Sequence, residues 1–145
     1  MIYSYTLSTP EIDIPERAVA DICSQLEGIA LREHSVRLVV CHYDYVEGGV
    51  LSALMAALPF PLIGATSFYQ ATPRASGLFE LTITLMTSDA VRFALAHSTS
   101  ERELTKRQRT ESAYRRAYAV HGQEPALMFS VMSANRPFTG DAYLR

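Results

Sequence analysis

Two carboxylates, Asp44 and Glu47, stand three residues apart directly before Gly48 and Gly49. Such a pair attracts a cationic group, and an ammonium suits it better than a phosphate, which the two negative charges would repel. The same spacing also fits a capping box, in which the carboxylates only satisfy backbone N–H groups at a helix start. The sequence alone leaves both interpretations open.

Groups that could bind a carboxylate follow further along the chain. Thr66 and Ser67, with a turn at Gly64, offer hydroxyl and backbone N–H groups, and Arg74 could form two parallel hydrogen bonds. Opposite preferences for charge at the two places predict a zwitterionic ligand. Four further candidates are Tyr43, Tyr45, Ser133 and Asn135, and Tyr69 could help to wall the pocket. Packing, turn chemistry or plain exposure explains these side chains equally well.

The other reactive residue types do not form a pattern typical of catalysis. His42 lies close to Asp44, but on an extended chain the pair would face no nucleophile, and the other three histidines are scattered. Cys23 and Cys41 fall in a predicted helix and a predicted buried strand, without metal-ligand spacing. As buried free thiols they predict a reducing, cytoplasmic setting. We expect no catalytic residue, metal or cofactor.

Residues 37–67 contain the elements that must position these candidates. Residues 38–41 form a short apolar run rich in β-branched side chains, which predicts a strand buried on both faces. Apolar residues then recur at helical spacing over residues 50–58, and residues 61–64 form a second short buried strand. This order predicts a βαβ unit with two parallel strands.

Ligands of such units usually bind beyond the carboxyl ends of the strands. Here those ends are residues 42–45 and 64–67, which contain most of the candidate side chains. The sequence therefore predicts the site where these two loops meet.

Elements on either side extend the predicted sheet. Residues 2–7 have strand composition and should lie at or near a sheet edge, and Asp13 is a candidate N-cap for the helix that follows. Residues 77–87 and 91–97 alternate between apolar and polar side chains. They predict an antiparallel pair whose odd-numbered residues face the core.

A helix over residues 99–120 and a buried strand over residues 125–131 complete the prediction. The fold class is α/β (α+β mixed), with a mixed parallel and antiparallel sheet, flanking helices and the central βαβ unit. The predicted strand over residues 125–131 lacks the helix that should follow it. We therefore expect self-association into a homo-oligomer, or a chain cut from a longer protein.

Composition restricts the partners. A chain of 145 residues with a 48% hydrophobic share suits a single αβ domain spanning residues 1–145. No apolar run approaches the roughly 20 residues of a membrane span. The predicted helix over residues 99–120 is locally basic, but it carries interleaved glutamates in a chain of net charge −2, so we expect no nucleic acid.

The chain resembles the N-terminal part of the FIST domain, a bacterial sensory and signal-transduction module. The resemblance rests on LVVCHYDY before a Leu/Ala-rich helix, on LPFPLIGATS, and on the alternating residues that follow. Ala65 stands where the family often has cysteine, and residues 68–70 replace a stretch that often contains Gly-Glu. The resemblance implies an intracellular domain that binds a small molecule, such as an amino acid, and signals to a fused or associated module.

Three hypotheses for function follow from the sequence. The first is a small-molecule sensory domain. The second is a non-catalytic interaction or structural subunit, and the third and weakest is a small-molecule enzyme. A cleft at the strand ends would favour sensing, whereas a flat apolar patch there would favour protein binding.

Overall fold

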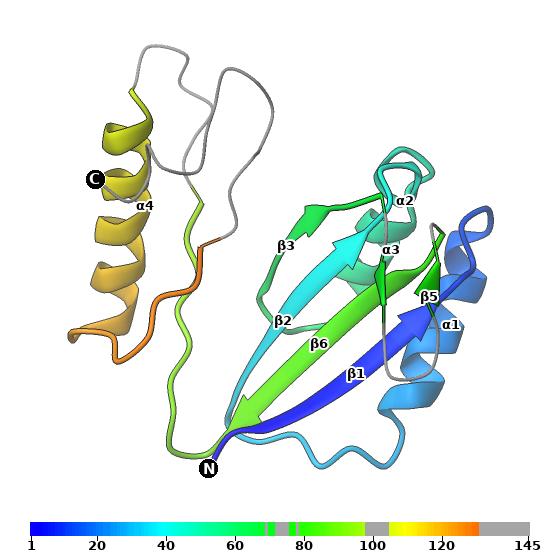
Figure 1. Ribbon diagram of the computed structural model, residues 1–145. Helices are drawn as coiled ribbons and strands as arrows, with labels where there is room; N and C mark the ends of the chain where they lie inside the picture. The colour runs from blue at the N-terminus through cyan, green and yellow to red at the C-terminus, as the bar shows by residue number, and fades with distance from the viewer. Residues whose placement is uncertain (69, 72–75, 78, 98–104, 131–145) are drawn as a thin grey trace. The chain divides into compact units, whose positions relative to one another are not determined.

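The computed structural model describes residues 1–68, 70–71, 76–77, 79–97 and 105–130 (Figure 1). The elements in chain order are β1 (Tyr3–Thr9), α1 (Pro15–Leu26), β2 (His34–Cys41), α2 (Asp44–Glu47), α3 (Val50–Ala57), β3 (Leu62–Thr66), β4 (Gln70–Ala71), β5 (Ser76–Gly77), β6 (Leu81–Ser88) and α4 (Lys106–His121). The chain divides into two compact units, Met1–Arg92 and Phe93–Arg145, and the first contains the whole sheet.

The main sheet has four strands in the order β1-β6-β2-β3. Strands β2 and β3 are parallel, and β6 is antiparallel to both β1 and β2. Consequently β1, β2 and β3 run in one direction, and their carboxyl ends share an edge of the sheet with the start of β6 (Figure 1). The predicted mixed sheet and the predicted central βαβ unit are both confirmed.

Helices α1 and α3 pack against each other and cover one face of this sheet. The strand residues that face them alternate, as a period of two requires. The fully buried core side chains include Ala18, Ile22, Val39, Val50, Leu54, Leu81 and Ile83. Burying one such aliphatic side chain contributes about 1.5–3 kcal/mol, so these residues stabilise the packing of the helices on the sheet. The odd-numbered residues of β6 face the core, as the sequence predicted.

The partner predicted for β6 is wrong. Residues 91–97 form no strand, and β6 instead lies between β1 and β2 with a hydrogen-bonded ladder on each side. A strand has only two edges, so once β1 and β2 occupy them no place remains for a third neighbour. Alternation identified a half-buried strand correctly, but it carries no information about which strand pairs with it.

The predicted strand over residues 125–131 is also wrong where it can be followed. Residues 125–130 have no regular structure, and Leu127, Met128 and Phe129 are 86%, 59% and 66% exposed. Val131 lies outside the described residues. An apolar run favours burial, but a strand forms only where a neighbouring strand supplies hydrogen bonds.

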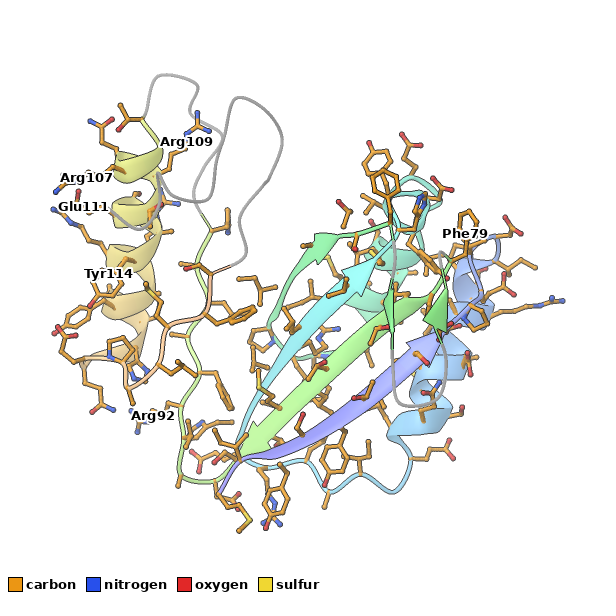
Figure 2. All side chains as sticks on the ribbon, viewed as in Figure 1. Phe79, Arg92, Arg107, Arg109, Glu111 and Tyr114 are labelled. Carbon is orange, nitrogen blue, oxygen red and sulfur yellow. The ribbon has the colours of Figure 1, made fainter. Side chains whose placement is uncertain are left out.

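The second unit contains α4, which begins at Lys106 and ends at His121; residues 98–104 lie outside the described part. Its start is fixed by a capping box: the Thr105 hydroxyl accepts from the Gln108 N–H at 3.3 Å, and the Gln108 side chain accepts from the Thr105 N–H at 2.8 Å. Arg107, Arg109, Glu111 and Tyr114 are labelled on this helix in Figure 2. Among the described residues, no helix has the length and apolar character needed to cross a membrane.

Candidate functional site

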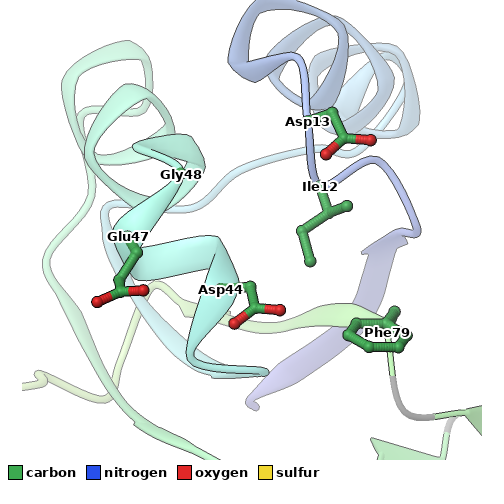
Figure 3. Close-up of a pocket in the computed structure, with 6 residues that line it drawn as sticks. All are labelled: Ile12, Asp13, Asp44, Glu47, Gly48 and Phe79. Carbon is green, nitrogen blue, oxygen red and sulfur yellow. The ribbon is translucent and has the colours of Figure 1, made fainter.

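An open depression of about 450 Å³ lies at the edge of the sheet where β1 and β2 end and β6 begins. Six residues line it: Ile12, Asp13, Asp44, Glu47, Gly48 and Phe79. Figure 3 shows Ile12 and the Asp44 carboxylate pointing into the space between α2 and the β1–α1 loop, with Phe79 at one side. The sequence predicted a site at this carboxyl edge, but where residues 42–45 meet residues 64–67, and none of the described residues of the second loop lines the depression.

Helix α2 brings Asp44 and Glu47 to this edge, and Tyr45 fixes the helix. The Tyr45 side chain is fully buried, and its hydroxyl donates to the Thr9 carbonyl oxygen at 3.1 Å. Gly48 lets the end of α2 approach the β1–α1 loop, because a Cβ there would lie 3.2 Å from the Ile12 carbonyl oxygen and 3.0 Å from that of Asp44. One wall of the depression is therefore attached to the end of β1.

The capping-box interpretation of Asp44 and Glu47 is wrong. The N-cap of α3 is Gly49, with no side-chain hydrogen bond to the helix start, and both carboxylates lie inside α2 instead. The Gly48–Gly49 pair separates two short helices where the sequence suggested a loop and one helix. Neither carboxylate caps α3, so both can interact with a ligand.

The β1–α1 loop contributes a third carboxylate, that of Asp13. The sequence predicted Asp13 as the N-cap of α1, and this prediction is wrong: the N-cap is Ile14, whose side chain makes no hydrogen bond to the helix start. The loop before the helix is instead held by Glu11, whose Oε1 accepts from the N–H groups of Asp13 and Ile14, both at 3.1 Å. The Asp13 side chain lines the depression.

The charged residues that line the depression are all negative. None of the described residues that line the depression is a lysine or an arginine. An adjoining hollow of about 380 Å³ shares Ile12 and Asp13 and adds Glu11, Asp21 and one cation, Arg17. Burial, and after it the Glu80 carboxylate, raises the pKa of Tyr45 to about 12, so the phenol beneath the site stays protonated.

His42 stands beside the depression and contacts two of its lining residues. Its Nδ1 lies 3.3 Å from Asp44 Oδ2, and its ring meets the Phe79 ring edge-on at 5.0 Å between centroids. The ring of Phe68, which follows β3, also meets the His42 ring edge-on, at 5.6 Å between centroids. The expectation that His42 and Asp44 lie on an extended chain fails, because Asp44 begins α2.

The structure brings together only some of the predicted site residues. Asp44 and Glu47 line the depression, and Tyr43, 54% exposed, is the N-cap of α2 beside them. Tyr45 is a core residue whose side chain is not accessible to a ligand.

The predicted site residues in and directly after β3 do not line the depression. Gly64 lies inside β3 and not in a turn, Thr66 ends that strand, and the Ser67 N–H extends the ladder by donating to Cys41 O at 2.8 Å. None of them is among the described residues that line the depression. Arg74, Ser133, Asn135 and Tyr69 lie outside the described residues.

Four lining residues were missed: Ile12, Asp13, Gly48 and Phe79. The sequence does contain a feature that places two of them. From residue 3 to residue 66 strands and helices alternate, so β1 and β2 are joined by a helix and run in the same direction. The β1–α1 loop therefore lies at the same edge of the sheet as the end of β2. Phe79 follows only from knowing that β6 pairs antiparallel between them.

Within the described part of the chain, no group of three or more His, Cys, Asp or Glu side chains could hold a metal ion. Cys23 and Cys41 are free, and burial raises the pKa of the Cys41 thiol to about 11. Comparison with protein-family models, curated proteins and solved structures finds no match for the chain.

Proposed function

We propose that this chain is a sensory domain of the FIST type that binds a small organic cation and passes the signal to a fused or associated module. The observation that carries the proposal is the joint lining of one depression by Asp13, Asp44 and Glu47, with no described lysine or arginine among its lining residues. A site with this charge favours an ammonium and repels an anion.

The depression also contains an apolar part. Ile12 and the half-exposed ring of Phe79 lie next to the carboxylates, and they suit the hydrocarbon portion of the same ligand. A hydrogen bond between an ammonium and a carboxylate contributes about 1.5–3 kcal/mol, and a cation over an aromatic face about 0.5–2 kcal/mol. One ammonium with an apolar substituent would use both kinds of contact.

The proposal includes amino acids and related zwitterions as ligands. Their carboxylate would lie toward Thr66, Ser67 and Arg74, as the sequence suggested. The depression itself supports the ammonium half of this pose. A matched pair of ligands separates the two cases: phenylalanine carries the carboxylate, and phenethylammonium is the same cation without it.

The test begins with a thermal-shift screen of amino acids and of the amines that correspond to them, since a ligand that binds only the folded state raises its melting temperature. Calorimetry with the best ligand then compares Asp44→Asn and Asp13→Asn with Glu27→Gln, an exposed carboxylate at the far end of α1. We expect binding to weaken about tenfold or more in the two aspartate variants, which is the loss of one charge-assisted hydrogen bond. Equal affinity in all three variants would reject the site.

A second candidate function is docking of a protein partner. Four side chains at this edge, Tyr43, Val46, Phe68 and Phe79, are 39–79% exposed, and the depression between α2 and Phe79 is open and not enclosed. Exposed aromatic side chains of this kind are typical of interaction surfaces. A screen without any thermal shift, together with self-association that Phe68→Ser abolishes, would favour this function.

A further inference from the structure

His42 connects three strand ends at the proposed site. It follows β2 directly, its ring packs edge-on against Phe68 after β3 and against Phe79 before β6, and its side chain is only 16% exposed. The two phenylalanines are far more exposed, at 79% and 52%. The imidazole is thus held between them, while Phe79 and Asp44 line the depression.

One ring nitrogen, Nδ1, faces two groups of Asp44. The Asp44 backbone N–H donates to Nδ1 at 3.4 Å, and Asp44 Oδ2 lies 3.3 Å from the same nitrogen. An unprotonated Nδ1 accepts from the N–H, whereas a protonated Nδ1 donates to the carboxylate. The two arrangements exclude each other, because one nitrogen cannot accept and donate along the same lone-pair direction.

We propose that His42 is a positioning residue that determines, through its proton, whether the Asp44 carboxylate is available to the cationic ligand. The inference rests on the proposed function of the depression. With His42 neutral, Oδ2 has no charged partner within this pair and is free to bind an ammonium. With His42 protonated, the imidazolium occupies Oδ2 and adds a positive charge beside the site.

The sign of the effect follows from the groups that face His42. Asp44 on α2 is the charged group in contact with it, Phe68 and Phe79 are apolar, and Asp13 and Glu47 line the depression together with Asp44. When His42 is protonated, the Asp44 carboxylate is paired with the imidazolium, and only two of the three carboxylates of the depression remain available to the ligand. Affinity for a cation is therefore lower when His42 is protonated than when it is neutral.

Linkage requires the reverse effect of equal size. A cation bound at Asp44 opposes protonation of His42, just as protonation of His42 opposes binding of the cation. The domain would then respond to a cation and to protons through one carboxylate.

The first test needs no ligand. Nuclear magnetic resonance of the whole chain follows the His42 ring and the Asp44 amide proton as the pH is lowered. We expect both to change with the same midpoint, and the Asp44 amide proton to move upfield as its hydrogen bond to Nδ1 is lost. An Asp44 amide proton that does not respond together with the His42 ring would overturn the inference.

The second test uses phenethylammonium as the probe and calorimetry at two pH values, one above and one below the His42 midpoint. The parent should lose affinity about fivefold or more at the lower pH, a coupling of the ordinary size. In His42→Gln and in His42→Phe, which retains the ring packing, affinity should change little between the two values.

The outcomes separate this inference from the proposed function. No binding of the probe at the higher pH counts against the cation site, and the ligand-free titration still decides the role of His42. If the probe binds with the same pH dependence in the parent and in both His42 variants, the cation site is supported and the proposed role of His42 is rejected.

Discussion

The Arg37 guanidinium donates to the Leu58 carbonyl oxygen at 3.0 Å, which places a buried positive charge at the carboxyl end of α3. The same guanidinium also donates to the carbonyl oxygens of Leu54, at 3.3 Å, and of Phe60. Arg37 is 3% exposed, and burial lowers the pKa of its guanidinium. The charge is balanced by the negative end of the helix dipole and by three carbonyl groups.

Replacing this arginine should therefore destabilise the first unit. We expect Arg37→Met to lower the free energy of unfolding by about 3 kcal/mol, because the buried carbonyl groups of Leu54 and Leu58 lose their charged donor. Urea denaturation measures the change. Arg32→Met is the control, since Arg32 forms a partly exposed ion pair with Asp89 worth about 0–1 kcal/mol. Equal losses in the two variants would contradict a special role for Arg37.

Gly64 is required by the packing of β3 on β2. A Cβ at this position would overlap the Val39 carbonyl oxygen and lie 2.9 Å from the Val39 carbonyl carbon. Gly64→Ala should cost about 1–3 kcal/mol, the usual range for overpacking. At Gly77 an added Cβ meets no described atom within 4 Å, so Gly77→Ala should be nearly neutral in the same denaturation experiment. A neutral Gly64→Ala would mean that β3 can move away from β2.

Tyr45 should make stability decrease at high pH. In the unfolded chain a tyrosine ionises near pH 10, whereas burial, with the Glu80 carboxylate, raises the pKa of Tyr45 to about 12 in the folded chain. Between these values the unfolded state loses a proton that the folded state keeps, so the free energy of unfolding falls as the pH rises.

Tyr45→Phe isolates this contribution. At neutral pH the variant should be less stable by about 1 kcal/mol, because the hydrogen bond to Thr9 is lost. Above about pH 10 the difference from the parent should shrink, since phenylalanine cannot ionise. Tyr43→Phe, at an exposed position, should retain the decrease seen in the parent. A constant difference between parent and Tyr45→Phe from neutral to high pH would contradict the raised pKa.

Asp44 should matter for binding and little for stability. Because α3 begins at Gly49 without a side-chain cap, Asp44→Ala removes no N-cap, and we expect a change within about 0.5 kcal/mol in the denaturant midpoint. Loss of a true N-cap costs about 1 kcal/mol. A loss of that size here would restore a structural role for this carboxylate.

The parts of the fold that are local in the chain could be predicted from the sequence. The central βαβ unit followed from apolar runs at residues 38–41 and 61–64 on either side of a helix. The inward face of β6 followed from the alternation of Leu81, Ile83 and Leu85. In each case the side-chain period fixes which residues are buried.

Long-range pairing could not be predicted in the same way. Nothing in residues 81–88 indicates that their partners are residues 3–9 and 34–40, because a half-buried strand has the same pattern beside any neighbour. One lining residue of the site, Phe79, was missed for this reason, because it lies just before β6 and reaches the depression through the place of β6 between β1 and β2.

The pairing of β1 with β6 also determines the order in which the chain can fold. Strand β1 (Tyr3–Thr9) leaves the ribosome before its partner β6 (Leu81–Ser88), which is synthesised some seventy residues later. Until then β2, α3 and β3 can associate through contacts close in sequence, whereas β1 has no ladder to join. The β1–α1 loop and Phe79 therefore reach the depression last, and a nascent chain acquires its ligand site only when the sheet is complete.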